Sequence, residues 1–159
     1  MAGEATTWIA VPPAVAYAAV TDLARMGQWS PENRGGEWVD AGAAELGAAF
    51  RGRNHDGENE WETIATVIEA DAPNAFAFCI ASPGEVGTIW RYGFEPDGVG
   101  TVVTEVFEWH WTPLPDEGFR GRVGRMPLDR ATSVVAFRER HLQQNIEATL
   151  ARLKQTLEG

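Results

Sequence analysis

Between residues 36 and 111 the chain alternates apolar and polar positions, which is the two-residue period of side chains on a β-strand. Turn-forming clusters of Asp, Asn, Gly and Pro interrupt the alternation at short intervals, as at residues 55–59 and 71–74. The pattern predicts six strands, over residues 37–40, 48–54, 61–69, 76–80, 88–94 and 101–111. Because short turns join these strands, we expect an antiparallel meander.

A strand and two short helices are predicted before this meander. The strand covers residues 4–10, and Pro12-Pro13 then begin a helix, because a proline in the first turn lacks only an amide hydrogen that the helix does not use. A second helical turn near residues 23–28 ends at Trp29-Ser30-Pro31, since the residue before a proline avoids helical geometry.

The C-terminal part of the chain predicts one long helix, over residues 131–157, after an irregular stretch at residues 112–130. A loop of that length is typical of a lid or a disordered segment. One stripe of the helix is apolar at helical spacing, and His141 lies opposite it and is expected to be exposed. The stripe consists of Val135, Leu142, Ile146, Leu150, Leu153 and Leu157.

This stripe needs a partner surface, and the concave face of the sheet is the large candidate. We therefore predict an α+β fold in which a curved antiparallel sheet of about seven strands wraps around the long C-terminal helix. The expected order is one strand, two helices, six strands and the helix. A chain of 159 residues is about one domain's worth, so residues 1–159 are expected to form a single domain.

Charge and composition exclude several classes of partner. The formal net charge is −10, with 23 acidic and 13 basic residues, which argues against nucleic acid and against an anionic membrane surface. The apolar run at residues 9–20 is interrupted by Pro12-Pro13 and is too short for a membrane span. Cys79 is the single cysteine and has no disulfide partner, so we expect a cytoplasmic protein.

The sequence carries no motif for a metal or a cofactor, and we expect neither. His55, His110 and His141 are far apart in the sequence, and no phosphate-binding or dinucleotide-binding glycine pattern is present.

The order and spacing of several segments resemble the START-like helix-grip superfamily, also called SRPBCC, and within it the bacterial polyketide cyclase/dehydrase-like branch. The residues that carry this resemblance are Ile9-Ala10-Val11-Pro12-Pro13, Val20-Thr21-Asp22, Gln28-Trp29-Ser30-Pro31-Glu32, Gly47, Phe50-Arg51-Gly52-Arg53-Asn54, Trp61, Trp90-Arg91-Tyr92, Gly100-Thr101, Glu105, Thr149-Leu150 and Leu153-Lys154. The resemblance implies an internal cavity that binds lipids, sterols, polyketides or other apolar molecules. Some relatives are enzymes and many only bind, so the fold does not choose between these.

Strand alternation predicts which side chains face this cavity. The candidate walls are aromatic and come from six segments. They are Trp29, Phe50, Trp61, Phe78, Trp90, Phe107 and Trp109. The chain holds seven tryptophans in all, which favours a planar or aromatic ligand.

Three polar residues share the inward faces and are the candidate catalytic residues. Glu105 in an apolar cavity would have a raised pKa and act as general acid or base, or else pair with a loop arginine or backbone N–H groups. Asn54 would hydrogen-bond a ligand carbonyl or hydroxyl, or a neighbouring backbone group. Tyr92 would donate its hydroxyl to an enolate or phenolate, or simply form part of the wall.

Three functions remain open at this stage. The first is binding of a small hydrophobic or aromatic, polyketide-like molecule with catalysis of its cyclisation or dehydration by positioning and acid/base help. The second is a non-catalytic carrier of a lipid or metabolite, and the third is a protein-interaction module. The sequence allows a monomer or a homodimer.

Overall fold

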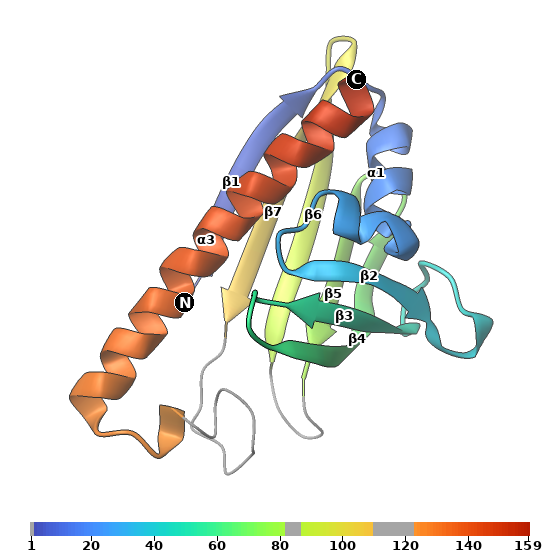
Figure 1. The fold of residues 1–159 in the computed structure, drawn as a ribbon. Coiled ribbons are helices and arrows are strands. Elements are labelled where there is room, and N and C mark those ends of the chain that lie inside the picture. The colour runs from blue at the N-terminus through green and yellow to red at the C-terminus, as the bar shows by residue number, and fades with distance from the viewer. Residues whose placement is uncertain (1, 82–86, 110–122) are drawn as a thin grey trace.

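The structure is a computed structural model that describes residues 2–81, 87–109 and 123–159 (Figure 1). Its elements are β1 (Ala2–Ile9), α1 (Pro13–Thr21), the 3-10 helix η1 (Leu23–Gln28), β2 (Asn33–Trp38), the 3-10 helix η2 (Val39–Ala41), β3 (Ala49–His55), β4 (Glu60–Asp71), β5 (Ala75–Ile80), β6 (Thr88–Asp97), β7 (Gly100–Trp109) and α3 (Leu128–Glu158). Apart from η2, their order is the predicted one. The strand predicted over residues 37–40 begins earlier, at Asn33, and ends at Trp38, and η2 takes the place of its last two residues. His110, Trp111 and most of the predicted lid lie outside the described residues.

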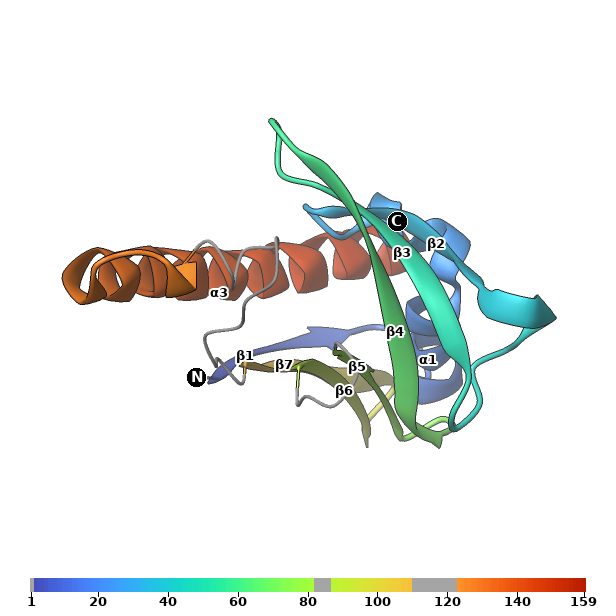
Figure 2. The same ribbon diagram turned by 90° about the horizontal axis from the view of Figure 1, so that it is seen from below.

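The strands form one antiparallel sheet in the order β1-β7-β6-β5-β4-β3-β2, which confirms the predicted meander. β1 pairs with β7, the last strand of the chain, so the first and last strands lie side by side at one end of the sheet. Figure 1 shows α3 crossing the sheet on one side, and Figure 2 shows β2, β3 and β4 curving around toward that same side. The predicted α+β fold is therefore confirmed, with an open sheet wrapped around the C-terminal helix.

Two β-bulges accompany this curvature. In β4, Val67 lies opposite Phe78 and Glu69 lies opposite Ala77, so Ile68 is an extra residue on that strand. A second register shift lies between Asn33 and Gly36 of β2. A bulge bends its strand and increases the local twist, which is how this half of the sheet leaves the plane of β1 and β7. The period-two pattern alone did not predict either bulge.

α3 packs its apolar stripe onto the sheet as predicted. Its buried residues include Val135, Leu142, Ile146, Leu150 and Leu153, and Leu157 is partly buried at the end of the stripe. The helix begins at Leu128, three residues before the predicted start, directly after Pro127. A proline at this place has a fixed φ that suits entry into a helix.

The buried side chains form two separate apolar clusters. The larger cluster joins α1, η1 and the strands to the C-terminal half of α3 through Leu150 and Leu153. The smaller cluster joins the end of β7 to the N-terminal half of α3 through Phe107, Val135 and Leu142. The boundary between these clusters therefore runs across both β7 and α3.

Candidate functional site

A carboxyl and a phenol meet in the interior, and both come from the predicted catalytic set. Tyr92 on β6 and Glu105 on β7 are direct cross-strand partners. Their side chains point to the concave face, and they are 5% and 2% exposed. The Tyr92 hydroxyl donates a hydrogen bond to Glu105 Oε1 over 2.6 Å. Glu105 Oε2 is buried and has no hydrogen-bond partner among the residues that the structure describes.

Burial decides the charge of this pair. Loss of hydration raises the pKa of Glu105 to about 8, while the hydrogen bond from Tyr92 acts in the opposite direction. Burial, and then the neighbouring Glu105, raise the pKa of Tyr92 well above its usual range. Both groups are therefore protonated near neutral pH. The pKa of Glu105 is raised, and its partner among the described residues is Tyr92, whereas the sequence also allowed a loop arginine or backbone amides. Arg120 and Arg122 of the predicted loop lie outside the described residues.

The pair lies at the boundary between the two apolar clusters. On β7, Val103 belongs to the larger cluster and Phe107 to the smaller one, and Glu105 lies between them. Ala5, the cross-strand partner of Glu105 on β1, packs against both clusters. On α3 the residue at the same boundary is Thr149, whose hydroxyl is used within the helix by a bond to the Asn145 carbonyl. The Tyr92–Glu105 hydrogen bond thus lies where the larger apolar cluster ends and the smaller one begins.

The predicted aromatic walls separate into the same two groups. Trp29, Phe50 and Phe78 belong to the larger cluster, where the Phe50 and Phe78 ring centroids are 5.0 Å apart. Phe107 and Trp109 belong to the smaller cluster. Trp90 is half-buried, packs against both clusters, and has its ring 5.8 Å from that of Phe107. These residues flank the Tyr92–Glu105 pair on the concave side of the sheet.

Asn54 and Trp61 lie apart from that pair. The Asn54 side chain donates to Thr63 Oγ1 and to the Gly52 carbonyl and accepts from the Asn33 amide, so the protein itself satisfies it. Of the three predicted polar residues, Tyr92 and Glu105 therefore lie together, and Asn54 lies in another region.

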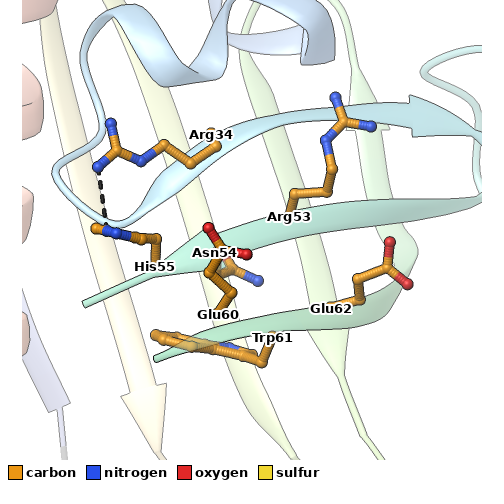
Figure 3. Close-up of a pocket in the computed structure, with 7 residues that line it drawn as sticks. All are labelled: Arg34, Arg53, Asn54, His55, Glu60, Trp61 and Glu62. Carbon is orange, nitrogen blue, oxygen red and sulfur yellow. Dashed lines mark hydrogen bonds between the residues drawn. The ribbon is translucent and has the colours of Figure 1, made fainter. Parts of the chain in front are cut away.

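That region is an open pocket of about 480 Å³ at the β3–β4 hairpin, drawn in Figure 3. Its lining consists of Arg34, Arg53, Asn54, His55, Glu60, Trp61 and Glu62. Arg34 donates to His55 Nδ1, and the Gly57 amide donates to the same nitrogen. Two arginines and two glutamates give this pocket a balanced charge and an open rim, which is unlike the apolar cavity that we predicted. We therefore place the candidate site at Tyr92 and Glu105.

An ion-pair bridge that sequence reasoning missed joins the start of β2 to α3. The Glu32 carboxylate is 15% exposed, accepts two hydrogen bonds from Arg138, and lies 3.4 Å from His141 Nε2. The expectation that His141 is exposed was wrong in part, because its ring is half-covered beside this carboxylate. Glu32 and Arg138 are 106 positions apart, so no local pattern could have paired them.

Breaking this bridge is expected to have a modest effect. We expect Glu32→Gln to lower the free energy of unfolding by about 1 kcal/mol, because a half-buried bidentate pair exceeds an exposed one only slightly. The matched control is Glu62→Gln, which removes an exposed pair with Arg51 at 4.0 Å and should change stability by less than about 0.5 kcal/mol. Urea unfolding measures both. Equal effects would show that the bridge adds nothing to the fold.

Metal-binding clusters and membrane-spanning helices are both absent from residues 2–81, 87–109 and 123–159. No three His, Cys, Asp or Glu side chains gather there closely enough to hold a metal ion. None of the helices in those parts is long and apolar enough to cross a bilayer.

An open antiparallel sheet that wraps a long C-terminal helix defines a protein of the helix-grip class. The chain belongs to the family described as polyketide cyclase / dehydrase and lipid transport, which matches residues 3–158. The resemblance deduced from the sequence is thereby confirmed over nearly the whole chain.

Solved structures of the same fold include three instructive cases. The chain is similar to the Polyketide_cyc-like protein Cgl2372 from Corynebacterium glutamicum, with 31% identity, a TM-score of 0.69, and coverage of 99% of this chain and 91% of that one. TTHA0849 from Thermus thermophilus shares 18% identity at a TM-score of 0.72, with 99% and 97% of the chains covered. The Aha1 dimer from Colwellia psychrerythraea shares 15% identity at a TM-score of 0.62, with 99% and 96% covered. A search of the curated proteins found no match.

Proposed function

We propose that this protein binds a small, largely apolar molecule on the concave side of the sheet, with Glu105 as its polar contact. The unpartnered Glu105 Oε2 carries this proposal. A buried polar atom without a hydrogen bond costs a few kcal/mol, and a ligand group placed there supplies the missing partner. The family's description as cyclases, dehydrases and lipid transport proteins supports an apolar ligand.

A catalytic role for Glu105 is a second candidate. A general acid is most effective when its pKa lies near the working pH, and burial raises the pKa of Glu105 to about 8. Such a group could protonate a leaving hydroxyl or a carbonyl oxygen during cyclisation or dehydration, while Tyr92 holds the carboxyl in place through its hydrogen bond. Asn54 has no part in this step, because its hydrogen bonds are made within the protein.

The test uses the tryptophans as probes. We would titrate the protein with fatty acids, sterol-like compounds and polyphenolic polyketide mimics, follow intrinsic fluorescence, and analyse each mixture by mass spectrometry. Trp109 belongs to the smaller cluster that adjoins the pair, and Trp90 packs against it, so saturable quenching by an apolar compound is expected. A new product that Glu105→Gln abolishes, with binding retained, would support catalysis.

Other outcomes separate the alternatives. Saturable binding without a product would support a non-catalytic carrier and contradict catalysis. No response to any compound class, together with a stable complex with another protein, would overturn the proposal in favour of an interaction module. The control is Glu62→Gln on the outer face, which should bind and react as the unchanged protein does.

A further inference from the structure

The two oxygens of Glu105 have different surroundings, and this difference constrains the ligand. Oε1 accepts the Tyr92 hydroxyl hydrogen at 2.6 Å, while the buried Oε2 contacts no donor or acceptor among the described residues. A tyrosine hydroxyl has one hydrogen, and here it is already committed to Oε1. Tyr92 therefore has no hydrogen left for a ligand, and an acceptor placed at Oε2 takes its hydrogen bond from the Glu105 carboxyl.

Among the described residues, burial and the Tyr92 hydrogen bond are what shift the pKa of this carboxyl, and no charged side chain adds to them. The cross-strand partners of Glu105 are Tyr92 on β6 and Ala5 on β1. On α3, Thr149 lies at the boundary between the two clusters, and its hydroxyl donates to the Asn145 carbonyl. The neighbours of Glu105 on the same face of β7 are Val103 and Phe107. A carboxyl in such surroundings is stable only in its neutral form. Because Oε1 accepts from Tyr92, the acid proton lies on Oε2 and is free to be donated.

We propose that the interior site selects a neutral ligand with a bare carbonyl oxygen, such as a ketone or an ester, which accepts a hydrogen bond from the protonated Oε2 of Glu105. This inference rests on the proposed function and narrows its ligand class. A carbonyl oxygen has no hydrogen of its own, so a single donor satisfies it. An alcohol would bring a hydroxyl hydrogen of its own, and the Tyr92 hydroxyl oxygen, which could accept it, is bonded on the Oε1 side of the carboxyl, away from Oε2. A hydroxyl hydrogen left without an acceptor carries a desolvation cost. A carboxylate would add an anion where no cation compensates it.

The same geometry makes the preference depend on pH. The pKa of Glu105 is raised to about 8, so at higher pH the carboxyl becomes an anion and Oε2 becomes an acceptor. A ligand hydroxyl can then donate to Oε2, whereas a carbonyl oxygen facing an anion is repelled. The order of ketone and alcohol affinities should therefore reverse between pH 6.5 and pH 9.5.

Four compounds with one apolar skeleton test this inference. They are 2-acetylnaphthalene, 1-(2-naphthyl)ethanol, 2-naphthoate and 2-ethylnaphthalene, and equilibrium dialysis measures their dissociation constants. At pH 6.5 the ketone should bind about fivefold to tenfold more tightly than the alcohol, which is the value of one net hydrogen bond, and naphthoate should bind most weakly. At pH 9.5 the alcohol should bind more tightly than the ketone.

Two variants complete the test. Glu105→Gln keeps a donor at this position and should favour the ketone at both pH values. Glu105→Leu should bind 2-ethylnaphthalene as tightly as the ketone. If Glu105→Leu does not fold, the loss of the pH reversal in Glu105→Gln tests the same point.

The outcomes distinguish this inference from the function on which it rests. If the unchanged protein binds the ketone and the alcohol equally tightly, and also binds 2-ethylnaphthalene, the carbonyl preference is overturned. The proposal of an interior binding site would then still stand. A ketone preference that survives in Glu105→Leu would also overturn this inference. Failure of all four compounds to bind would overturn the interior site itself, and the inference with it.

Discussion

Replacing Glu105 by glutamine is expected to stabilise the protein increasingly as the pH rises, by about 4–5 kcal/mol at pH 8 and above. The pKa of the folded carboxyl is about 8, whereas the ordinary value is 4.5. Below pH 4.5 both the folded and the unfolded chain hold the proton. Between these values only the folded chain holds it, so each pH unit costs the natural protein about 1.4 kcal/mol of stability, and the loss is complete above the folded pKa. Glutamine does not titrate and avoids this loss.

The measurement is urea unfolding of both proteins at several pH values between 4.5 and 9. At pH 4.5 their free energies of unfolding should agree closely, because glutamine can still accept the hydrogen bond from Tyr92. Glu62→Gln is the control, since its side chain is exposed, and its curve should run parallel to that of the natural protein. A difference between Glu105→Gln and the natural protein that stays constant with pH would show that Glu105 titrates alike in the folded and unfolded chains.

Phe107→Ala is expected to lower the free energy of unfolding by about 3–5 kcal/mol, the usual cost of removing a fully buried phenylalanine. Phe107 is 0% exposed and joins β7 to the N-terminal half of α3 in the smaller cluster. Its ring also packs against Trp90. Because that cluster has few members, little side-chain movement is available to fill the cavity.

The matched control is Phe137→Ala, since Phe137 lies on α3 and is 66% exposed. It should change stability by less than about 0.5 kcal/mol. Urea unfolding again gives both values, and Phe107→Leu provides a milder variant if Phe107→Ala does not fold. Similar losses for Phe107→Ala and Phe137→Ala would mean that the smaller cluster does not hold α3 on the sheet.

These two expectations concern opposite kinds of interior residue. Phe107 stabilises the fold by its burial, whereas Glu105 lowers stability at neutral pH by the same burial. A core residue that weakens its own fold breaks the local rule that interiors are apolar, and such exceptions are concentrated at functional sites. This is the physical ground for placing the candidate site at Glu105 and Tyr92 and not at the charged pocket of the β3–β4 hairpin.

Part of this pair was accessible from the sequence. Alternation placed Tyr92 and Glu105 on inward faces, and the turn after Pro96 was recognised. Asp97 pairs with Gly100 across a two-residue turn in which Gly98 has a φ of +61°, a conformation that favours glycine. The register that starts at this turn continues without a shift to Tyr92 and Glu105. Counting back from the turn would therefore have paired them.

Asn54 shows where such reasoning stops. Its inward direction was predicted from Phe50 and Gly52 on the same strand. In the structure Asn54 is partly buried and bonds to the Gly52 carbonyl and to Thr63. Its distance from Glu105 depends on the order of five strands and on how far the sheet curves, which period two does not encode. Trp61 is the cross-strand partner of Asn54, so it too lies at the hairpin pocket and away from the other predicted wall residues.

The sequence by itself determined the elements, their order and the faces that they bury, because two-residue and helical periods are local properties of neighbouring residues. The tertiary structure decided what meets across the interior: the two apolar clusters, the bridge from Glu32 to Arg138, and the unpartnered oxygen of Glu105 between β7 and α3. These contacts join residues far apart in the chain, and their geometry follows from strand register, bulges and the docking of α3. No local sequence pattern predicts these three features, because each forms only when the open sheet wraps around the helix.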